Sequence, residues 1–76
     1  MPKRDTLPER LRDARISAGM SQADLEARAG LSLRHVSIIE QGRRPNLTIA
    51  VLAKLARALA VSADWLLGLT ENPKRK

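Results

Sequence analysis

The side chains of this sequence that could carry chemistry are mainly basic. Fourteen Lys and Arg residues stand against eight Asp and Glu residues, which gives a formal net charge of +6. Such an excess in a short chain suits a polyanionic partner. Between residues 32 and 60 a single acid, Glu40, opposes the cations Arg34, Arg43, Arg44, Lys54 and Arg57. The positive charge is therefore concentrated in the middle of the chain.

Catalytic and metal sites find little support in the sequence. The chain has no Cys and one histidine, His35, so a thiol nucleophile, a zinc site or a His-centred triad is not expected. The closest carboxylates in the sequence, Asp24 and Glu26, are two residues apart and would point in different directions on a helix. We expect no enzyme, no metal, no cofactor and no small-molecule ligand.

The beginning of the chain is polar and basic, without the apolar segment of a secretory signal. No apolar run approaches the roughly 20 residues that span a bilayer. We expect no membrane association and a location in the cytoplasm.

Helix starts are marked by capping residues, most of them preceded by an apolar residue. The caps are Thr6, Ser21, Ser32, Thr48 and Ser62. They predict helices over residues 7–18, 22–29, 33–41, 49–60 and 63–67, and hence an all-α fold. We expect one domain over residues 6–69, between a flexible N-terminus (residues 1–5) and a basic flexible tail (residues 70–76).

Gly30 and Leu31, followed by the cap Ser32, join the second and third predicted helices, a turn so short that the helices should cross steeply. Apolar spacing turns Val36 and Ile39 of the third helix inward. The opposite face then carries Leu33, Arg34, Ser37, Ile38 and Gln41. A helix about 10 to 12 Å across fits the DNA major groove, which is about 12 Å wide. Arg34 suits the O6 and N7 atoms of guanine.

Two stretches, Met20–Gly30 and Val36–Arg44, resemble the Cro and lambda-type repressor (Xre) family of helix-turn-helix proteins. The similarity continues through Val61–Gly68 and covers about residues 7–68. It implies a five-helix, lambda-repressor-like DNA-binding domain with its third helix in the major groove. The stretch Asn46–Ile49 is also similar to controller proteins of restriction-modification systems.

The resemblance also implies roles for individual residues. Base contacts are implied for Ser32, Leu33, Arg34, Ser37 and Ile38. Phosphate contacts are implied for Ser21, Gln22, Gln41, Arg43, Arg44 and Asn46.

Two positions depart from the family pattern. Leu33 stands where several phage repressors have an amide that reads adenine, so the operator cannot be transferred. Glu26 stands where the family usually has a small residue. We expect its carboxylate to bend outward or to find a donor at the amino end of the third helix.

Arg15 falls in the apolar stripe of the first helix, and Glu40 flanks Val36 and Ile39. A half-buried Arg needs a carboxylate partner, and related repressors pair the matching residues. We expect a structural ion pair.

Trp65 is expected in the core or in a dimer interface. Trp65 lies in the fifth predicted helix, four residues before Leu69, and together the two predict an apolar strip for a homodimer.

The sequence thus predicts a sequence-specific, double-stranded DNA-binding transcriptional regulator, either a repressor or a controller protein, on a pseudo-palindromic operator. The alternative is a protein–protein interaction module that keeps the fold without binding DNA. Such a module would tend to show an acidic or apolar third helix, whereas this helix carries Arg34.

Overall fold

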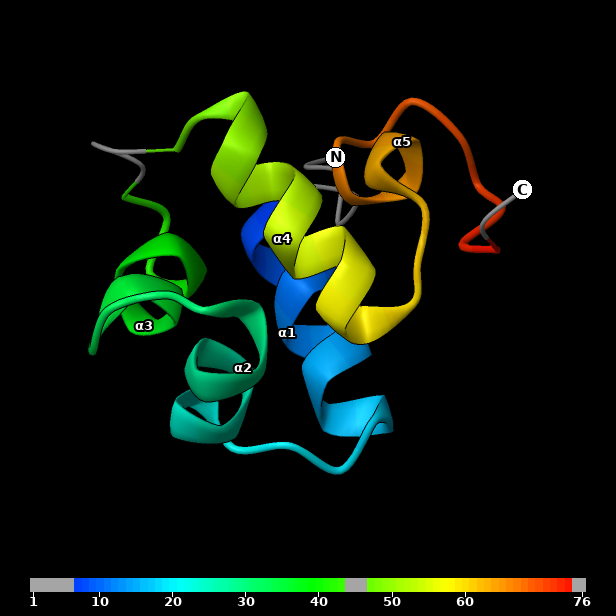
Figure 1. Ribbon diagram of the computed structural model, residues 1–76. Helices are drawn as coiled ribbons and strands as arrows, with labels where there is room; N and C mark the ends of the chain where they lie inside the picture. The colour runs from blue at the N-terminus through cyan, green and yellow to red at the C-terminus, as the bar shows by residue number, and fades with distance from the viewer. Residues whose placement is uncertain (1–6, 44–46, 75–76) are drawn as a thin grey trace.

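The computed structural model describes residues 7–43 and 47–74, and every regular element in these ranges is an α-helix. The helices are α1 (Leu7–Ser17), α2 (Gln22–Ala29), α3 (His35–Glu40), α4 (Ile49–Leu59) and α5 (Ala63–Leu66). In Figure 1, α4 crosses in front of α1, with α2 and α3 on one side and α5 on the other. The predicted all-α fold is confirmed.

Every helix contributes at least one fully buried aliphatic side chain to the core, namely Leu11, Leu25, Val36, Ile39, Leu55 and Leu66. Each such side chain contributes about 1.5 to 3 kcal/mol through its removal from water. Helices of 4 to 11 residues are too short to persist alone in water. Packing against this shared core therefore stabilises all five.

Side-chain caps begin three of the helices as predicted. Ser21 Oγ accepts from the backbone N–H of Asp24, and Thr48 and Ser62 make the equivalent contacts at α4 and α5. At α2 the contact is reciprocal, because the backbone N–H of Ser21 donates to Asp24 Oδ2 at 3.0 Å. This hydrogen bond lowers the pKa of Asp24. The predicted cap Thr6 lies outside the described residues.

The predicted start of the third helix at residue 33, with Ser32 as its cap, is wrong. Helix α3 begins at His35, and its N-cap position is occupied by Arg34 with φ 71°, without a side-chain capping hydrogen bond. The backbone N–H of Val36 donates to the Glu26 carboxylate of α2 instead of to the Ser32 carbonyl, which a helix beginning at 33 would require. The residues from Ser32 to Arg34 consequently form a turn.

The described part of the predicted tail, residues 70–74, is hydrogen-bonded to the body of the protein. The backbone N–H of Ser62 donates to the carbonyl of Pro73 at 2.8 Å. The Arg10 guanidinium donates to the carbonyls of Trp65 and Thr70, at 2.7 and 2.8 Å. Residues 75 and 76 of the predicted tail lie outside the described residues.

No helix in the described ranges has the length and apolarity needed to cross a membrane.

Helix α4 ends one residue before the predicted end, because Ala60 adopts the left-handed conformation with φ 57°. That conformation strains every side chain and suits glycine. We therefore expect Ala60→Gly to raise the free energy of unfolding by about 1 kcal/mol. Urea denaturation followed by circular dichroism would measure the change.

The matched control is Ala27→Gly, at an exposed position inside α2. The same substitution there should lower the free energy of unfolding by about 1 kcal/mol, because glycine in a helix loses more backbone freedom on folding. Destabilisation by both substitutions would show that Ala60 is not strained.

Candidate nucleic-acid interface

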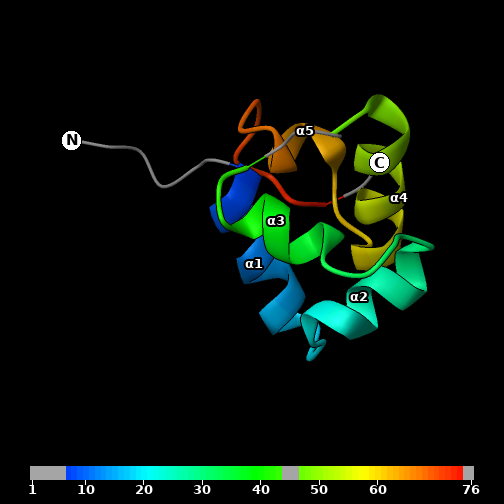
Figure 2. The same ribbon diagram turned by 90° about the vertical axis from the view of Figure 1, so that its left-hand side faces the viewer.

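Helix α3 lies at the edge of the fold and faces the viewer in Figure 2. Its inner residues Val36 and Ile39 are buried in the core, so the predicted inward face is confirmed. The turn before it is exposed, with Leu33 81% accessible and Ser32 and Arg34 also in solvent. Ser37 and Ile38 are half-buried. The residues with implied base contacts therefore fall into an exposed turn and a less accessible helical part.

The residues with implied phosphate contacts differ in their exposure to solvent. Ser21, Gln41 and Arg43 are exposed, and Gln22 is half-buried. The Gln41 amide donates to Ser37 Oγ at 3.1 Å, one helical turn earlier. Arg44 and Asn46 lie outside the described residues.

Glu26 is 4% accessible, so of the two expectations for its carboxylate, the outward bend is wrong. The expected donor at the amino end of the third helix is present, because Glu26 Oε2 accepts from the backbone N–H of Val36 at 3.0 Å. The first turn of α3 has no acidic residue of its own. The anion from α2 supplies the acceptor that the exposed N–H groups of a helix start need.

A short connection fixes α2 against α3. Gly30 ends α2 in the left-handed conformation with φ 73°, and the backbone N–H of Leu31 returns to the Glu26 carbonyl at 2.9 Å. Leu31 is half-buried and packs on the core. The chain therefore leaves α2 in one defined direction, towards the turn that precedes α3.

Arg15 and Glu40 form a largely buried ion pair between α1 and α3. Arg15 Nε lies 2.8 Å from Glu40 Oε2, and Nη2 lies 3.1 Å from Oε1. The two side chains are only 12% and 5% accessible. The hydrogen bond to Glu40 raises the pKa of Arg15. Two parallel charge-assisted hydrogen bonds fix the relative orientation of the helices as well as their separation.

Gln22 is a further member of this cluster that the sequence analysis did not identify. Its Nε2 donates to Glu40 Oε1 at 3.1 Å, and Arg15 Nη1 donates to the Met20 carbonyl at 2.9 Å. Glu40 thus connects α1, α2 and α3. A side-chain amide has two N–H groups, and the hydrogen bond to Glu40 uses one of those of Gln22.

The strip predicted for a dimer interface is partly covered. Trp65 is half-buried, and the Arg10 guanidinium lies 5.0 Å from the centre of its ring. Leu69 is 73% accessible and Leu67 is also exposed, whereas Leu66 is buried. Arg10 is 7% accessible and was missed by the sequence analysis, although it lies between Leu7 and Leu11 on the apolar stripe.

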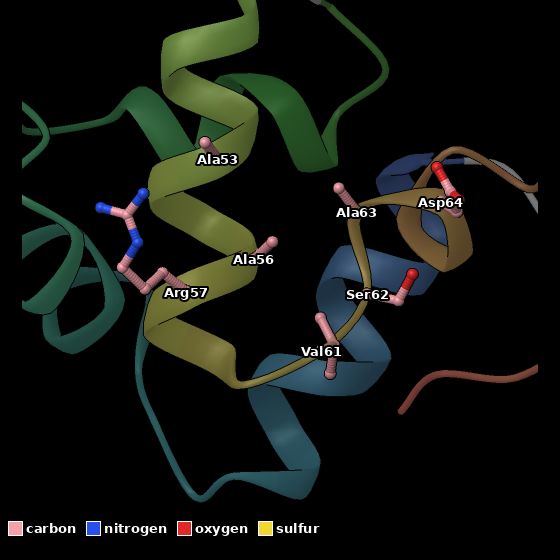
Figure 3. A pocket seen from close by; sticks show the side chains of 7 residues that line it. All are labelled: Ala53, Ala56, Arg57, Val61, Ser62, Ala63 and Asp64. Carbon is pink, nitrogen blue, oxygen red and sulfur yellow. The ribbon is translucent and has the colours of Figure 1, made fainter. Parts of the chain in front are cut away.

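One hollow of the described residues lies between two helices. The hollow in Figure 3, between α4 and α5, is lined mainly by alanine and valine, and its charged residues Arg57 and Asp64 point away from each other. Ser62 Oγ, in the same hollow, accepts from the Trp65 backbone. The described residues contain no group of three or more potential metal ligands. The turn before α3 and the exposed part of α3 remain the candidate site.

Comparison with known proteins identifies this arrangement. A helix-turn-helix family model, HTH_3, matches residues 11–66. The chain is 41% identical over 58 residues to the uncharacterised HTH-type transcriptional regulator y4dJ of Sinorhizobium fredii, covering 76% of this chain and 74% of that protein.

Two solved structures are similar in both fold and sequence. The restriction-modification controller protein C.AhdI from Aeromonas hydrophila superimposes with a TM-score of 0.74 and 34% identity, covering 80% of this chain and 91% of that one. A chain of the SinR protein/SinI protein complex superimposes with a TM-score of 0.75 and 31% identity, covering 82% of this chain. This chain spans only 60% of the length of that SinR/SinI chain.

The buried ion pair generates a stability prediction. Glu40→Ala leaves Arg15 buried without its carboxylate, which should lower the free energy of unfolding by about 3 to 5 kcal/mol. Arg15→Met combined with Glu40→Leu removes both charges and should lose much less. Thermal denaturation of the three proteins measures both effects.

Glu71→Ala is the control, because the Glu71 carboxylate pairs with Arg10 at 3.1 Å but its side chain is 86% accessible. The Glu71 carboxylate is solvated, and the buried Arg10 guanidinium keeps its hydrogen bonds to the carbonyls of Trp65 and Thr70 without it, so this variant should melt close to the wild type. Equal melting temperatures for Glu40→Ala and Glu71→Ala would contradict a special role for the buried pair.

Proposed function

Because the chain belongs to the Cro/C1-type helix-turn-helix family of DNA-binding transcriptional regulators, we propose that it binds a pseudo-palindromic operator as a homodimer and acts as a repressor or controller protein in the cytoplasm. The observation that carries the proposal is the exposed turn at Arg34, presented by a helix whose opposite face is locked into the core. The proposal includes no catalytic activity.

The base-reading part consists of the turn and the outer side of α3. The Arg34 guanidinium is exposed and suits a bidentate contact with guanine O6 and N7. Leu33 offers an apolar surface for the methyl group of thymine. Ser32, Ser37 and Ile38 complete the base-reading set in this proposal. Since Ser37 shares a hydrogen bond with Gln41, a base contact by its hydroxyl would exchange that bond for one to DNA.

The phosphate-contacting part flanks these residues. Gln22 is held by Glu40 at the start of α2, and its second amide N–H can donate to a phosphate oxygen. The hydroxyl of Ser21 accepts from Asp24 and keeps its proton as a donor. Gln41 and Arg43 contribute from the carboxyl end of α3, and the proposal adds Arg44 and Asn46 from outside the described residues.

Dimerisation follows from the small size of the module, since one recognition helix reads few base pairs and buries limited DNA surface. Leu69 and the accessible part of Trp65 offer the contact, together with Leu67. A two-fold axis through this surface would place the half-site centres about 34 Å apart, one turn of the duplex.

Selection of bound sequences from randomised DNA tests the function directly. We expect an enriched motif with two-fold symmetry and a half-site spacing near 10 base pairs, one helical turn. Recovery of DNA without any enriched sequence would contradict specific reading and favour the interaction-module alternative.

Arg34 and Arg43 should respond differently to truncation. Arg34→Ala should weaken binding to the selected operator by about 1 to 3 kcal/mol and relax preference at one base pair. Arg43→Ala, which removes a phosphate contact in this proposal, should weaken all sequences to a similar degree and flatten the salt dependence. Gel-shift titrations at several salt concentrations distinguish the two. An equal loss on operator and random DNA for Arg34→Ala would exclude base reading by this residue.

Leu69→Glu should give a folded monomer whose affinity for a full operator falls towards its affinity for a half-site. The physical reason is that a charge at the apolar contact opposes its burial. Ile16→Glu is the control, because Ile16 is an exposed aliphatic residue on α1, outside the proposed interface. Analytical ultracentrifugation and gel shifts measure both variants. A wild type that remains monomeric at high concentration and binds full and half sites equally would refute the dimer.

A further inference from the structure

The backbone N–H of Val36 is one donor with two competing acceptors. A helix that began at residue 33 would direct this N–H to the carbonyl of Ser32, four residues earlier. In the structure it donates to Glu26 Oε2 at 3.0 Å, and the Ser32 carbonyl accepts from His35 at 3.3 Å instead. The two arrangements exclude each other, because each requires the same proton. The carboxylate therefore decides whether residues 32 to 34 form a turn or the first turn of α3.

The turn has features that need an external restraint. Arg34 adopts φ 71° and ψ −4° without a side-chain capping bond, and the left-handed conformation is unfavourable for any residue with a Cβ atom. Leu33 is 81% accessible, so packing does not hold the turn from the outside. The buried carboxylate of Glu26 supplies the restraint, since winding the helix would leave this anion without its backbone donor.

The conformation of Arg34 determines where its side chain is presented. A change from the left-handed to the helical conformation redirects the bond from Cα to Cβ, and a bidentate contact with a base tolerates little misplacement. We propose that Glu26 is a positioning residue for DNA reading, which holds Ser32–Arg34 as a turn and thereby sets the base pair that Arg34 reads. This inference rests on the proposed function, because it assigns base reading to Arg34.

The length of the Glu26 side chain and its acceptor oxygen are both needed for this role. A small residue would leave the Val36 N–H available to Ser32, and Ser32 is itself a good N-cap. With Glu26 present, the same serine caps nothing and the helix begins at His35. One substitution on α2 thus changes the start of α3 without altering any residue that faces DNA.

The first test is made on the protein without DNA. In the wild type, the three-bond coupling between the amide proton and Hα of Arg34, with the Cα chemical shifts of Leu33 and Arg34, should report a left-handed residue in a turn. In Glu26→Ala these values should become helical. Glu26→Gln keeps a neutral acceptor oxygen and should keep the turn. Asp24→Ala removes a capping carboxylate from the same helix and should leave the turn unchanged.

The second test selects operators with the same proteins, below their melting temperatures and at equal folded fraction. We expect Glu26→Ala to lose preference about tenfold at the base pair that Arg34→Ala identifies. Preferences at the remaining base pairs and affinity for random DNA should stay as in the wild type, and Glu26→Gln should restore the preference. A loss of stability alone would not change the preference at one base pair while leaving the others unchanged.

The two tests separate the possible failures. An unchanged Arg34 coupling in Glu26→Ala overturns the proposal, and so does a helical coupling with unchanged operator preference. If Glu26→Ala does not fold, a helical Arg34 coupling in Glu26→Gln would likewise contradict control by the acceptor. A wild type that selects no DNA sequence would refute the proposed function, whereas the coupling would still decide whether Glu26 holds the turn.

Discussion

Helix α3 has six residues, too few to hold itself together or to set its own direction. Two carboxylates that are largely withdrawn from solvent stabilise α3 and fix its direction. Glu26 accepts from the first turn, and Glu40 joins the last turn to Arg15. A negative charge suits the amino end of a helix but not the carboxyl end. The guanidinium beside Glu40 is therefore required, and the placement of α3 depends on this pair.

Four of the described arginines, Arg10, Arg15, Arg34 and Arg43, fall into two groups according to whether they bond to the rest of the protein. Arg10 and Arg15 are largely withdrawn from solvent and bonded to the protein, the first holding the chain after α5 and the second holding α3. Arg34 and Arg43 are exposed and form no ion pair within the described residues. Arg10 and Arg15 therefore stabilise the fold, whereas the charges of Arg34 and Arg43 are available to a polyanionic partner.

Sequence patterns predicted the start of a helix correctly where the capping contact joins residues close in the chain. The caps at Ser21, Thr48 and Ser62 were identified because each accepts from an N–H three residues later. The pair of Arg15 and Glu40 was expected because Arg15 falls in an apolar stripe, Glu40 flanks another, and related repressors pair the matching residues. The cap at Ser32 failed, since a carboxylate from another helix takes the N–H of Val36. Arg10 was missed because its partners, such as the Thr70 carbonyl, lie 60 residues away, beyond any periodic pattern.

The buried carboxylates of Glu26 and Glu40 also affect the charge of the surface around Arg34. Glu26 and Glu40, the acids nearest to Arg34 along the chain, are turned inward and consumed by internal hydrogen bonds. The exposed Asp24 is engaged by the backbone of Ser21. Anions left free beside Arg34 would repel phosphates and weaken binding at every sequence. Burial of the two glutamates thus orders α3 and withdraws two negative charges from the surface, which favours the approach of a polyanion.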